Sequence, residues 1–436
     1  MPEATLTKSQ TQYLDDLAQQ GESGQPAWLD EIRADGKSVL ESTTFPHNKM
    51  EEWRHTNISA LTKTHYKTAS ETTVSAGALS DATLAPAGWA ELVFVDGHYS
   101  ATLSNVTNLP EGVILGNIPA HQGSEVLQQH IHKILQHRNA YTALNSAFLQ
   151  DGAFVYVPKK VVVETPIHLL FVSTTGAAGC VAHVRTIIAL EESSAATITT
   201  SYVGLDDTAD YLNNVVEEIY VGANAQLTYY KVVQEGAAGN HLATSEILQD
   251  RDSRLFSLVI SQDGKVIRNQ SCVKLAGEGA ECALHGLYLN DGDRLIDNAL
   301  HIHHTVPHCN SRIAYKGILD GKSKTVFTGK VNVDQAAQQT DSDQLSNNLL
   351  LSDTATLDTK PQLEIYADDV KCTHGATVGS HPEPIIFYFQ SRGIDEATAR
   401  GMLTYGFADE IVREIKPEAL RDRLESYVFR KYSPKQ

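Results

Sequence analysis

Residues 215–233 read VVEEIYVGANAQLTYYKVV, two runs of β-branched and aromatic residues that flank a short turn of small and polar residues. Such runs favour β-strands, and Gly222 and Asn224 favour the turn between them. Similar runs recur through residues 153–379 at intervals of roughly 10–20 residues, without a clear amphipathic helix between them. Several are apolar at consecutive positions, as at residues 349–351, which is typical of buried strands. The pattern fits a sandwich, a barrel or a stack of coils, and we favour the stack, a β-solenoid.

Helical patterns flank this β region. Apolar residues at helical spacing predict a helix over residues 124–149, and shorter patterns occur nearer the N-terminus. After the β region, one face of a predicted helix collects apolar residues at a spacing of four: Leu403, Phe407, Ile411 and Ile415. A second helix begins near Pro417. We therefore predict a mixed, largely helical region at 1–150, the β core at 151–383 and a helical region at 384–436.

The overall composition excludes several classes of partner. The 436 residues include 35 Lys and Arg against 53 Asp and Glu, a net charge of −18. Nucleic acids and anionic membranes both require a surplus of basic residues, so neither is expected to bind. Five scattered cysteines do not make a disulfide framework, and neither a secretory signal nor an apolar stretch of about 18 residues is visible. We expect a cytoplasmic protein with reduced thiols.

Cys372 and His374 form one candidate metal site, within LEIYADDVKCTH (363–374). Continuous strand alternation would place both side chains on the outward face, unless Asp368 and Asp369 form a turn that resets it. Thiolate and imidazole ligands suit an iron–sulfur cluster, zinc or copper. Two ligands do not complete a site, so a partner chain or distant residues must supply the others. The alternative is a buried cysteine beside a hydrogen-bonded histidine.

A second group of potential ligands lies in ALHIHHTVPHCNSR (299–312). Its members are His301, His303, His304, His308 and Cys309. They lack the spacing of closed zinc sites, so a polar strand face is as good an interpretation as a metal site.

Motifs for self-sufficient catalysis are missing. KGILDGKS (316–323) is not a phosphate-binding loop, because only three residues separate Gly317 from Gly321 where four are needed. Cys-x-x-Cys, His-Glu-x-x-His and Gly-x-Ser-x-Gly are also missing. Nucleotide hydrolysis and acyl transfer therefore have no support in the sequence.

Three stretches together resemble the SufB/SufD family of iron–sulfur cluster assembly. They are FPHNKMEEWRHTN (45–57), the segment from ALNSAFLQDGAFVYVP to HLLFVS (143–173), and the segments from HTVPHCNSRIAYKGIL (304–319) to SRGIDEATARGMLTYGFADEIV (391–412). Within the family, DTKPQLEI (358–365) and VKCTHGATVG (370–379) look like the D-type subunit. No cysteine-rich N-terminal segment supports the B-type subunit, which stays an alternative.

This resemblance implies a right-handed parallel β-helix between helical ends and a non-catalytic scaffold subunit. It implies a heterodimer with the B-type paralogue, an ABC-type ATPase docked on residues 394–430, and a nascent iron–sulfur cluster shared with the paralogue. His374 matches the family's interface histidine and Cys372 its neighbouring cysteine, and Asp368 and Asp369 could tune that site. The isolated chain is expected to lack the cluster and could homodimerise, and the complex could contain a flavin. The location would be the cytoplasm or a plastid stroma.

Two other classes remain as alternatives. One is a β-solenoid enzyme acting on carbohydrate, although such enzymes are commonly secreted and line a groove with acidic and aromatic side chains. The other is a stand-alone mononuclear metalloprotein that uses the histidines of residues 301–309.

Overall fold

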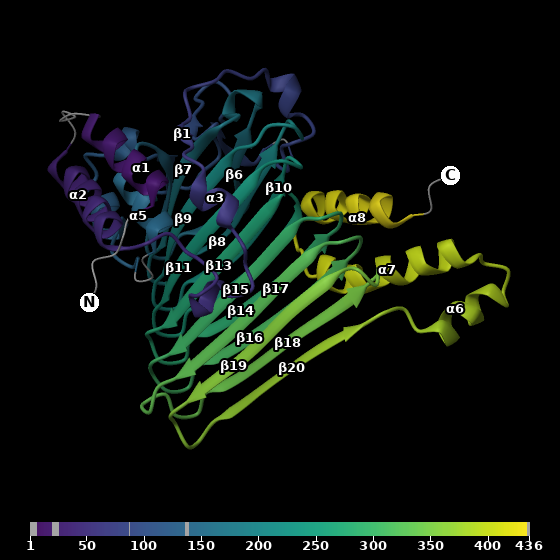
Figure 1. The fold of residues 1–436 in the computed structure, drawn as a ribbon. Coiled ribbons are helices and arrows are strands. Elements are labelled where there is room, and N and C mark those ends of the chain that lie inside the picture. The colour runs from purple at the N-terminus through teal and green to yellow at the C-terminus, as the bar shows by residue number, and fades with distance from the viewer. Residues whose placement is uncertain (1–6, 20–25, 87, 136–138, 434–436) are drawn as a thin grey trace.

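The chain forms two long parallel sheets that face each other. The structure, a computed structural model, describes residues 7–19, 26–86, 88–135 and 139–433. Successive core strands alternate between the sheets, and each strand pairs in register with the strands two positions away. Gln226, for example, pairs with Ala195 on one side and Arg254 on the other. Each coil thus gives one strand to each sheet, which confirms the predicted β-solenoid, here with about eight turns (Figure 1).

In the described part of the chain, each sheet contains ten strands. In spatial order, sheet A contains β19 (Thr356–Ile365), β17 (Lys324–Val333), β15 (Leu295–His304), β13 (Val266–Leu275), β11 (Asn240–Gln249), β9 (Leu212–Val221), β7 (Cys180–Leu190), β5 (Gly152–Val157) and β4 (Ile114–Asn117), with β1 (Lys67–Thr68) beside β7. Sheet B contains β20 (Lys371–Gly379), β18 (Asp341–Leu350), β16 (Asn310–Leu319), β14 (Glu281–Asn290), β12 (Arg254–Asp263), β10 (Gln226–Glu235), β8 (Ala195–Gly204), β6 (Val162–Ser173), β2 (Ala90–Val95) and β3 (His98–Tyr99).

The interior consists of side chains stacked in rows from coil to coil. Alternate residues of each strand point inward, and the parallel register places equivalent residues directly above one another. Leu284 of β14, for example, lies between Ser257 of β12 and Ile313 of β16. Leu284 and Ile313 are each 2 % exposed, and burying one such side chain stabilises the fold by about 1.5–3 kcal/mol.

The first coils also enclose a charged pair. Lys231 Nζ lies 3.2 Å from Glu217 Oε2, and both side chains are buried. The hydroxyls of Tyr202 and Tyr229 donate hydrogen bonds to the other carboxylate oxygen, at 3.1 and 2.8 Å, so the buried charge is satisfied. Burial acts to raise the pKa of Glu217, but the Lys231 ammonium group and hydrogen bonds from Ser245 and Tyr229 hold it below its usual value.

The N-terminal region packs on the outer face of sheet A near its first strands. Its elements are α1 (Lys8–Gln19), α2 (Ala27–Ser42), η1 (Glu51–Trp53), α3 (Ser59–Lys63), η2 (Ala76–Leu79), η3 (Pro119–His121), α4 (Glu125–His130) and α5 (Ala140–Ala147), and η4 (Thr175–Ala177) follows within the core. Gly36 allows α2 to cross α5 closely, because a Cβ there would lie 2.5 Å from the backbone nitrogen of Ala147. The apolar side chains of α1 and α5 reach Val181, Leu212 and Leu242 of the sheet.

The single helix predicted over residues 124–149 is wrong. The segment contains two helices, α4 and α5, and His132 between them has a φ of 60° that no continuous helix allows. Asn139 starts the second helix, since its side chain accepts hydrogen bonds from the backbone N–H groups of Tyr141 and Thr142. Residues 136–138 lie outside the described part of the chain.

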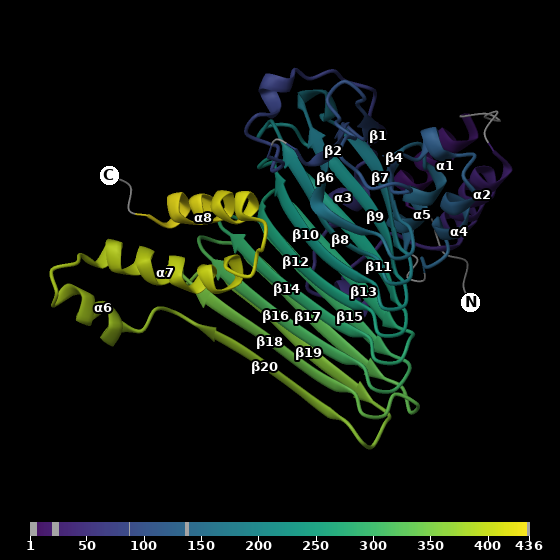
Figure 2. The same ribbon diagram turned by 180° about the vertical axis from the view of Figure 1, so that it is seen from behind.

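Three C-terminal helices extend beside sheet B: α6 (Glu383–Gln390), α7 (Glu396–Val412) and α8 (Glu418–Tyr432). Figures 1 and 2 show α7 and α8 running out from the sheet, with α6 at the far end of α7. Pro384 lies in the first turn of α6, where its missing N–H leaves no hydrogen bond unmade. None of the helices in the described ranges is long and apolar enough to cross a membrane.

Candidate functional site

The last coil leaves the solenoid open at one end. β19 and β20 stand at the ends of their sheets, and each pairs with one neighbour only within the described chain. In β5, near the other end, all residues except Tyr156 are buried, whereas no residue of β20 is buried. The inner face of the last coil and the free edges of its strands are therefore accessible.

Cys372 and His374 lie on this inner face. Cys372 pairs with Ser342, and His374 with Gln344, two residues of β18 that are 2 % and 1 % exposed. Cys372 thus ends the inner row of Cys282, Ser311 and Ser342, while His374 ends the row of Leu284, Ile313 and Gln344. The bend at residues 368–369 resets the alternation, which was one of the two predicted outcomes, so both side chains lie on the inner face and not on the outer one. Sequence reasoning did identify correctly that both side chains share one face.

The two potential ligands differ in their surroundings. Cys372 is half-buried against the interior, and burial raises the pKa of its thiol above the usual value, although a backbone hydrogen bond at Ser342 opposes this. His374 is exposed. Beneath it, both polar atoms of the Gln344 side-chain amide are buried without a hydrogen-bond partner in the structure. A metal ion binds a thiolate, so binding at Cys372 must displace a proton.

The rim around these residues is apolar. The inner face of β19 contributes Leu357 and Leu363, which pack partly against the core, and Ile365, which is 38 % exposed. On β20, Val378 continues the inner face with 53 % exposure. An apolar surface with free strand edges is typical of a contact with another chain.

Asp368 and Asp369 lie in the turn that leads into β20. Both are exposed. The backbone N–H of Asp369 donates to Gln338 Oε1 at 2.9 Å, and its carbonyl accepts from the backbone of Gln339 at 2.6 Å, which fixes the turn to the preceding coil. These backbone contacts anchor the turn, and a tuning role of the two carboxylates at the Cys372 site stays a prediction.

The residues of 301–309 do not converge. His304 and Cys309 point into the solenoid and are buried, with His304 Nε2 2.9 Å from Ser311 Oγ. His301 and His303 lie on the outer face of sheet A, where His303 Nε2 is 2.9 Å from Asp334 Oδ1. His308 lies in a turn, 3.5 Å from Glu278. In the described ranges, no group of three or more His, Cys, Asp or Glu side chains could hold a metal ion.

The predicted stripe packs mostly within the chain. Its placement on one helix is wrong for Ile415, because α7 ends at Val412 and Ile415 follows in the connection to α8. Ile411 and Ile415 are 3 % and 0 % exposed and contact apolar residues on the outer face of sheet B, among them Tyr230, Leu258, Leu287 and Ile318. Leu403 and Phe407 are partly buried, and the Lys316 ammonium lies 4.5 Å from the centre of the Phe407 ring. Ile411 and Ile415 therefore attach the helix to the solenoid and present no surface to a partner.

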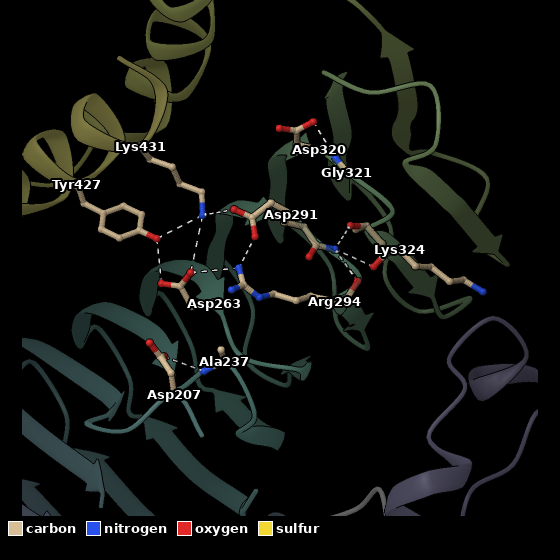
Figure 3. A network of polar contacts seen from close by, with 12 residues as sticks. Asp207, Ala237, Asp263, Asp291, Arg294, Asp320, Gly321, Lys324, Tyr427 and Lys431 are labelled. Atoms are coloured by element: carbon tan, nitrogen blue, oxygen red, sulfur yellow. Dashed lines mark hydrogen bonds and ion pairs between the residues drawn. The ribbon is translucent and has the colours of Figure 1, made fainter. Parts of the chain in front are cut away.

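Polar contacts join the C-terminal part of α8 to turns of the solenoid (Figure 3). Tyr427 donates a hydrogen bond to Asp263 at 2.9 Å, and Lys431 Nζ lies 2.9 Å from Asp291 and 3.8 Å from Asp263. Arg294 contacts the same two carboxylates, so two cations balance two anions at this corner. Burial is the main reason why the pKa of Tyr427 lies well above its usual value, and the nearby negative charges raise it further.

Most of the exposed large apolar side chains of the C-terminal helices lie on α6, and Phe429 of α8 is a further one, 60 % exposed. Ile385, Phe387 and Tyr388 are 42 %, 71 % and 55 % exposed, and Met402 of α7 is 51 % exposed. Sequence reasoning missed this surface, but a signal was present. The run IIFYF (385–389) covers the whole circumference of a helix, so part of it must stay exposed when only one side packs.

The fold and the site define a parallel β-solenoid protein that has two potential metal ligands at its uncovered end and helices beside one sheet. Its similarity to known proteins identifies the family. Residues 171–407 match the model of the SUF system FeS cluster assembly, SufBD core domain, and residues 7–169 match the SufBD protein N-terminal region. The chain belongs to the SufBD family of iron–sulfur cluster assembly proteins.

Individual relatives cover most of the chain. The SufBD family protein slr0076 of Synechocystis is 32 % identical over 406 residues, which span 91 % of this chain and 89 % of the relative. The SufD protein of Escherichia coli is 32 % identical over 392 residues, 88 % of this chain and 89 % of that protein. The chloroplastic protein ABCI7 of Arabidopsis thaliana is 30 % identical over 409 residues, 92 % of this chain and 85 % of that protein.

Proposed function

We propose that the chain is the D-type scaffold subunit of a SUF complex, without catalytic activity of its own. In this proposal the open end of the solenoid joins the B-type paralogue, and Cys372 and His374 contribute to the site at which a nascent iron–sulfur cluster is assembled. One observation supports it best. Cys372 and His374 are the last residues of two inner rows of the solenoid, on the coil that no described element covers. The SufD names of relatives from two bacteria favour the D-type over the B-type subunit.

The cluster is cargo in this proposal. One thiol and one imidazole from this chain, completed by ligands from the paralogue, would hold it incompletely and allow its release. The raised pKa of Cys372 keeps the thiol neutral until iron arrives, so the isolated chain should bind little metal. Any flavin would belong to the assembled complex, and the location would be the cytoplasm or a plastid stroma.

An ABC-type ATPase would dock on the C-terminal helices. The exposed side chains of α6 and Met402 offer the apolar surface, while the buried face of α7 connects that surface to sheet B. Closure of two ATPase subunits would then act on the solenoid through α7 and α8 and open the interface that contains Cys372 and His374.

The decisive experiment compares two exposed histidines. The chain is co-expressed with the B-type paralogue and the ATPase and purified without oxygen, as wild type, His374→Ala and His308→Ala. We expect His374→Ala to assemble normally but to contain about tenfold less iron and acid-labile sulfide, whereas His308→Ala matches the wild type. Wild-type iron content in His374→Ala would remove His374 from the site.

Thiol labelling tests the interface itself. Cys372 and Cys282 lie in the same inner row, but Cys282 is 3 % exposed inside the solenoid. In the isolated chain, we expect a small alkylating reagent to modify Cys372 and to leave Cys282 unmodified. Addition of the B-type paralogue should then protect Cys372, and unprotected Cys372 in a saturated complex would contradict the proposed interface.

Docking of the ATPase is tested by a point variant. Deleting residues 394–436 would expose the apolar face of sheet B and confuse loss of docking with loss of stability. Phe387→Asp changes only an exposed side chain, so it should abolish co-purification of the ATPase without altering the melting temperature. Val162→Asp is the control, since Val162 is 55 % exposed and lies on β6, outside the C-terminal helices. Unchanged co-purification with Phe387→Asp would overturn the α6 assignment.

A further inference from the structure

Residues 51–56, which we name the strap, cross the outer face of sheet A at the distal coils. Its anchor is buried. The Trp53 ring stacks on the guanidinium group of Arg268, 3.9 Å from the ring centre, and Arg268 is paired with Asp297 on the neighbouring strand. The Thr56 hydroxyl donates a hydrogen bond to the same carboxylate. The strap is thereby fixed to β13 and β15.

From this anchor the strap reaches the last strand of the sheet. Glu51 Oε1 lies 2.7 Å from Lys360 Nζ, and His55 Nδ1 lies 3.1 Å from Asp358 Oδ1. Lys360 and Asp358 both belong to β19. Residues separated by 309 positions in the chain are thus joined at the open end of the solenoid.

Between its anchor and these contacts, the strap stands away from the sheet. A groove of about 590 Å³ separates them, with small side chains of the sheet such as Ala299, Val326 and Thr328 among its lining. The Glu51–Lys360 ion pair and the His55–Asp358 contact, and not continuous packing, therefore connect the strap to β19.

The position of β19 bears on the candidate site. Among the described residues, β19 has a strand neighbour on one side only. The turn at residues 366–370 joins it to β20, which contains Cys372 and His374. A terminal coil of a stacked structure lacks half of its neighbours and opens more readily than the interior coils. A tether on β19 hence limits the opening of the whole last coil.

We propose that Glu51 and His55 are positioning residues that hold the last coil in register for the partner subunit, through Lys360 and Asp358. This inference rests on the proposed function for its role at the interface, but the tether itself can be measured in the isolated chain. Exposed ion pairs add little to global stability, so the effect is local to the last coil.

Amide hydrogen exchange of the full-length chain tests the tether. In Lys360→Ala, we expect exchange in residues 356–379 to accelerate about two- to fivefold, and in the double variant His55→Ala and Lys360→Ala about tenfold. Exchange in β9 to β12 and the melting temperature should not change. The matched control is Lys330→Ala. Lys330 pairs with Glu364 across adjacent strands, and although its charge acts on Glu51 it forms none of the ion pairs described for the strap.

A charge reversal separates a tether from general packing. Glu51→Lys should accelerate exchange in the last coil as Lys360→Ala does, and Glu51→Lys combined with Lys360→Glu should restore it. Equal exchange in Lys360→Ala and Lys330→Ala, or no rescue by the reversed pair, would overturn the proposal.

Binding to the B-type paralogue supplies the second readout. We expect the double variant His55→Ala and Lys360→Ala to bind about threefold to tenfold more weakly than the wild type, with the reversed pair again restoring affinity. Altered exchange without any change in affinity would leave the tether but overturn its role at the interface. Absence of binding by the wild type would contradict the proposed function instead.

Discussion

The two ends of the solenoid are built differently. At the first end, the antiparallel strands β3 and β4 reverse the chain direction beside β2 and β5 and complete the sheets. At the last end, β19 and β20 stop with free parallel edges and an accessible inner face. The chain therefore closes one end by itself and leaves the other to be covered, and the two candidate ligands lie at the end left open.

The largest expected effect comes from placing a charge at two points of one inner row. Leu284 and His374 belong to the same row, but only Leu284 is enclosed. Leu284→Asp buries an unpaired carboxylate and should cost about 3–5 kcal/mol of the free energy of unfolding. His374→Asp should change it by less than about 0.5 kcal/mol, because its site is exposed. Urea unfolding followed by circular dichroism measures both, and equal losses would show that the last coil is closed.

A smaller effect should come from protons. Burial, with a contribution from His303, lowers the pKa of His304 from 6.5 to about 4. The unfolded chain binds this proton first as pH falls, so the folded state loses stability between pH 6.5 and 4, by about 2 kcal/mol at pH 5. His304→Gln should flatten this part of the pH profile of urea unfolding. A His304→Gln profile as steep as that of the wild type would mean that the folded chain does not lower the pKa of His304.

The smallest effect concerns two exposed valines at opposite ends. Val378 on β20 is 53 % exposed and Val162 on β6 is 55 % exposed. Val378→Asp should weaken association with the B-type paralogue about tenfold, which corresponds to about 1.4 kcal/mol, while Val162→Asp should leave it unchanged. Analytical ultracentrifugation of mixtures gives both values. If Val162→Asp weakened association equally, the open end would not be the interface.

Much of the fold could be predicted from local patterns. Runs of β-branched and aromatic residues separated by turns identified the strands, because strand formation and turn formation depend on neighbouring residues. The break between α4 and α5 could not be predicted, since it depends on a distant contact. The backbone N–H groups of His132 and Ile134 donate to the carboxylate of Glu218, which lies on β9.

The sequence named Cys372 and His374 as candidate ligands on one face but left open which face that is. The face on which Cys372 and His374 lie depends on the turn before β20 and on register with β18, and turn geometry was not specified by alternation along one strand. Periodicity likewise identified the apolar face of α7, but it did not reveal that sheet B covers Ile411 and Ile415. The resemblance to the SufB/SufD family, and not periodicity, decided between the β-solenoid and a sandwich or a barrel.

The attachment of the C-terminal helices has a mechanical consequence. α7 and α8 contact Tyr230, Leu258, Leu287 and Ile318, which belong to four consecutive strands of sheet B. A force applied at α6 would therefore be divided among four coils, and the hydrogen-bonded ladders would transmit it along the solenoid axis as they would through a stiff beam. The last coil has neighbouring described strands on one side only, so it would move most under such a force.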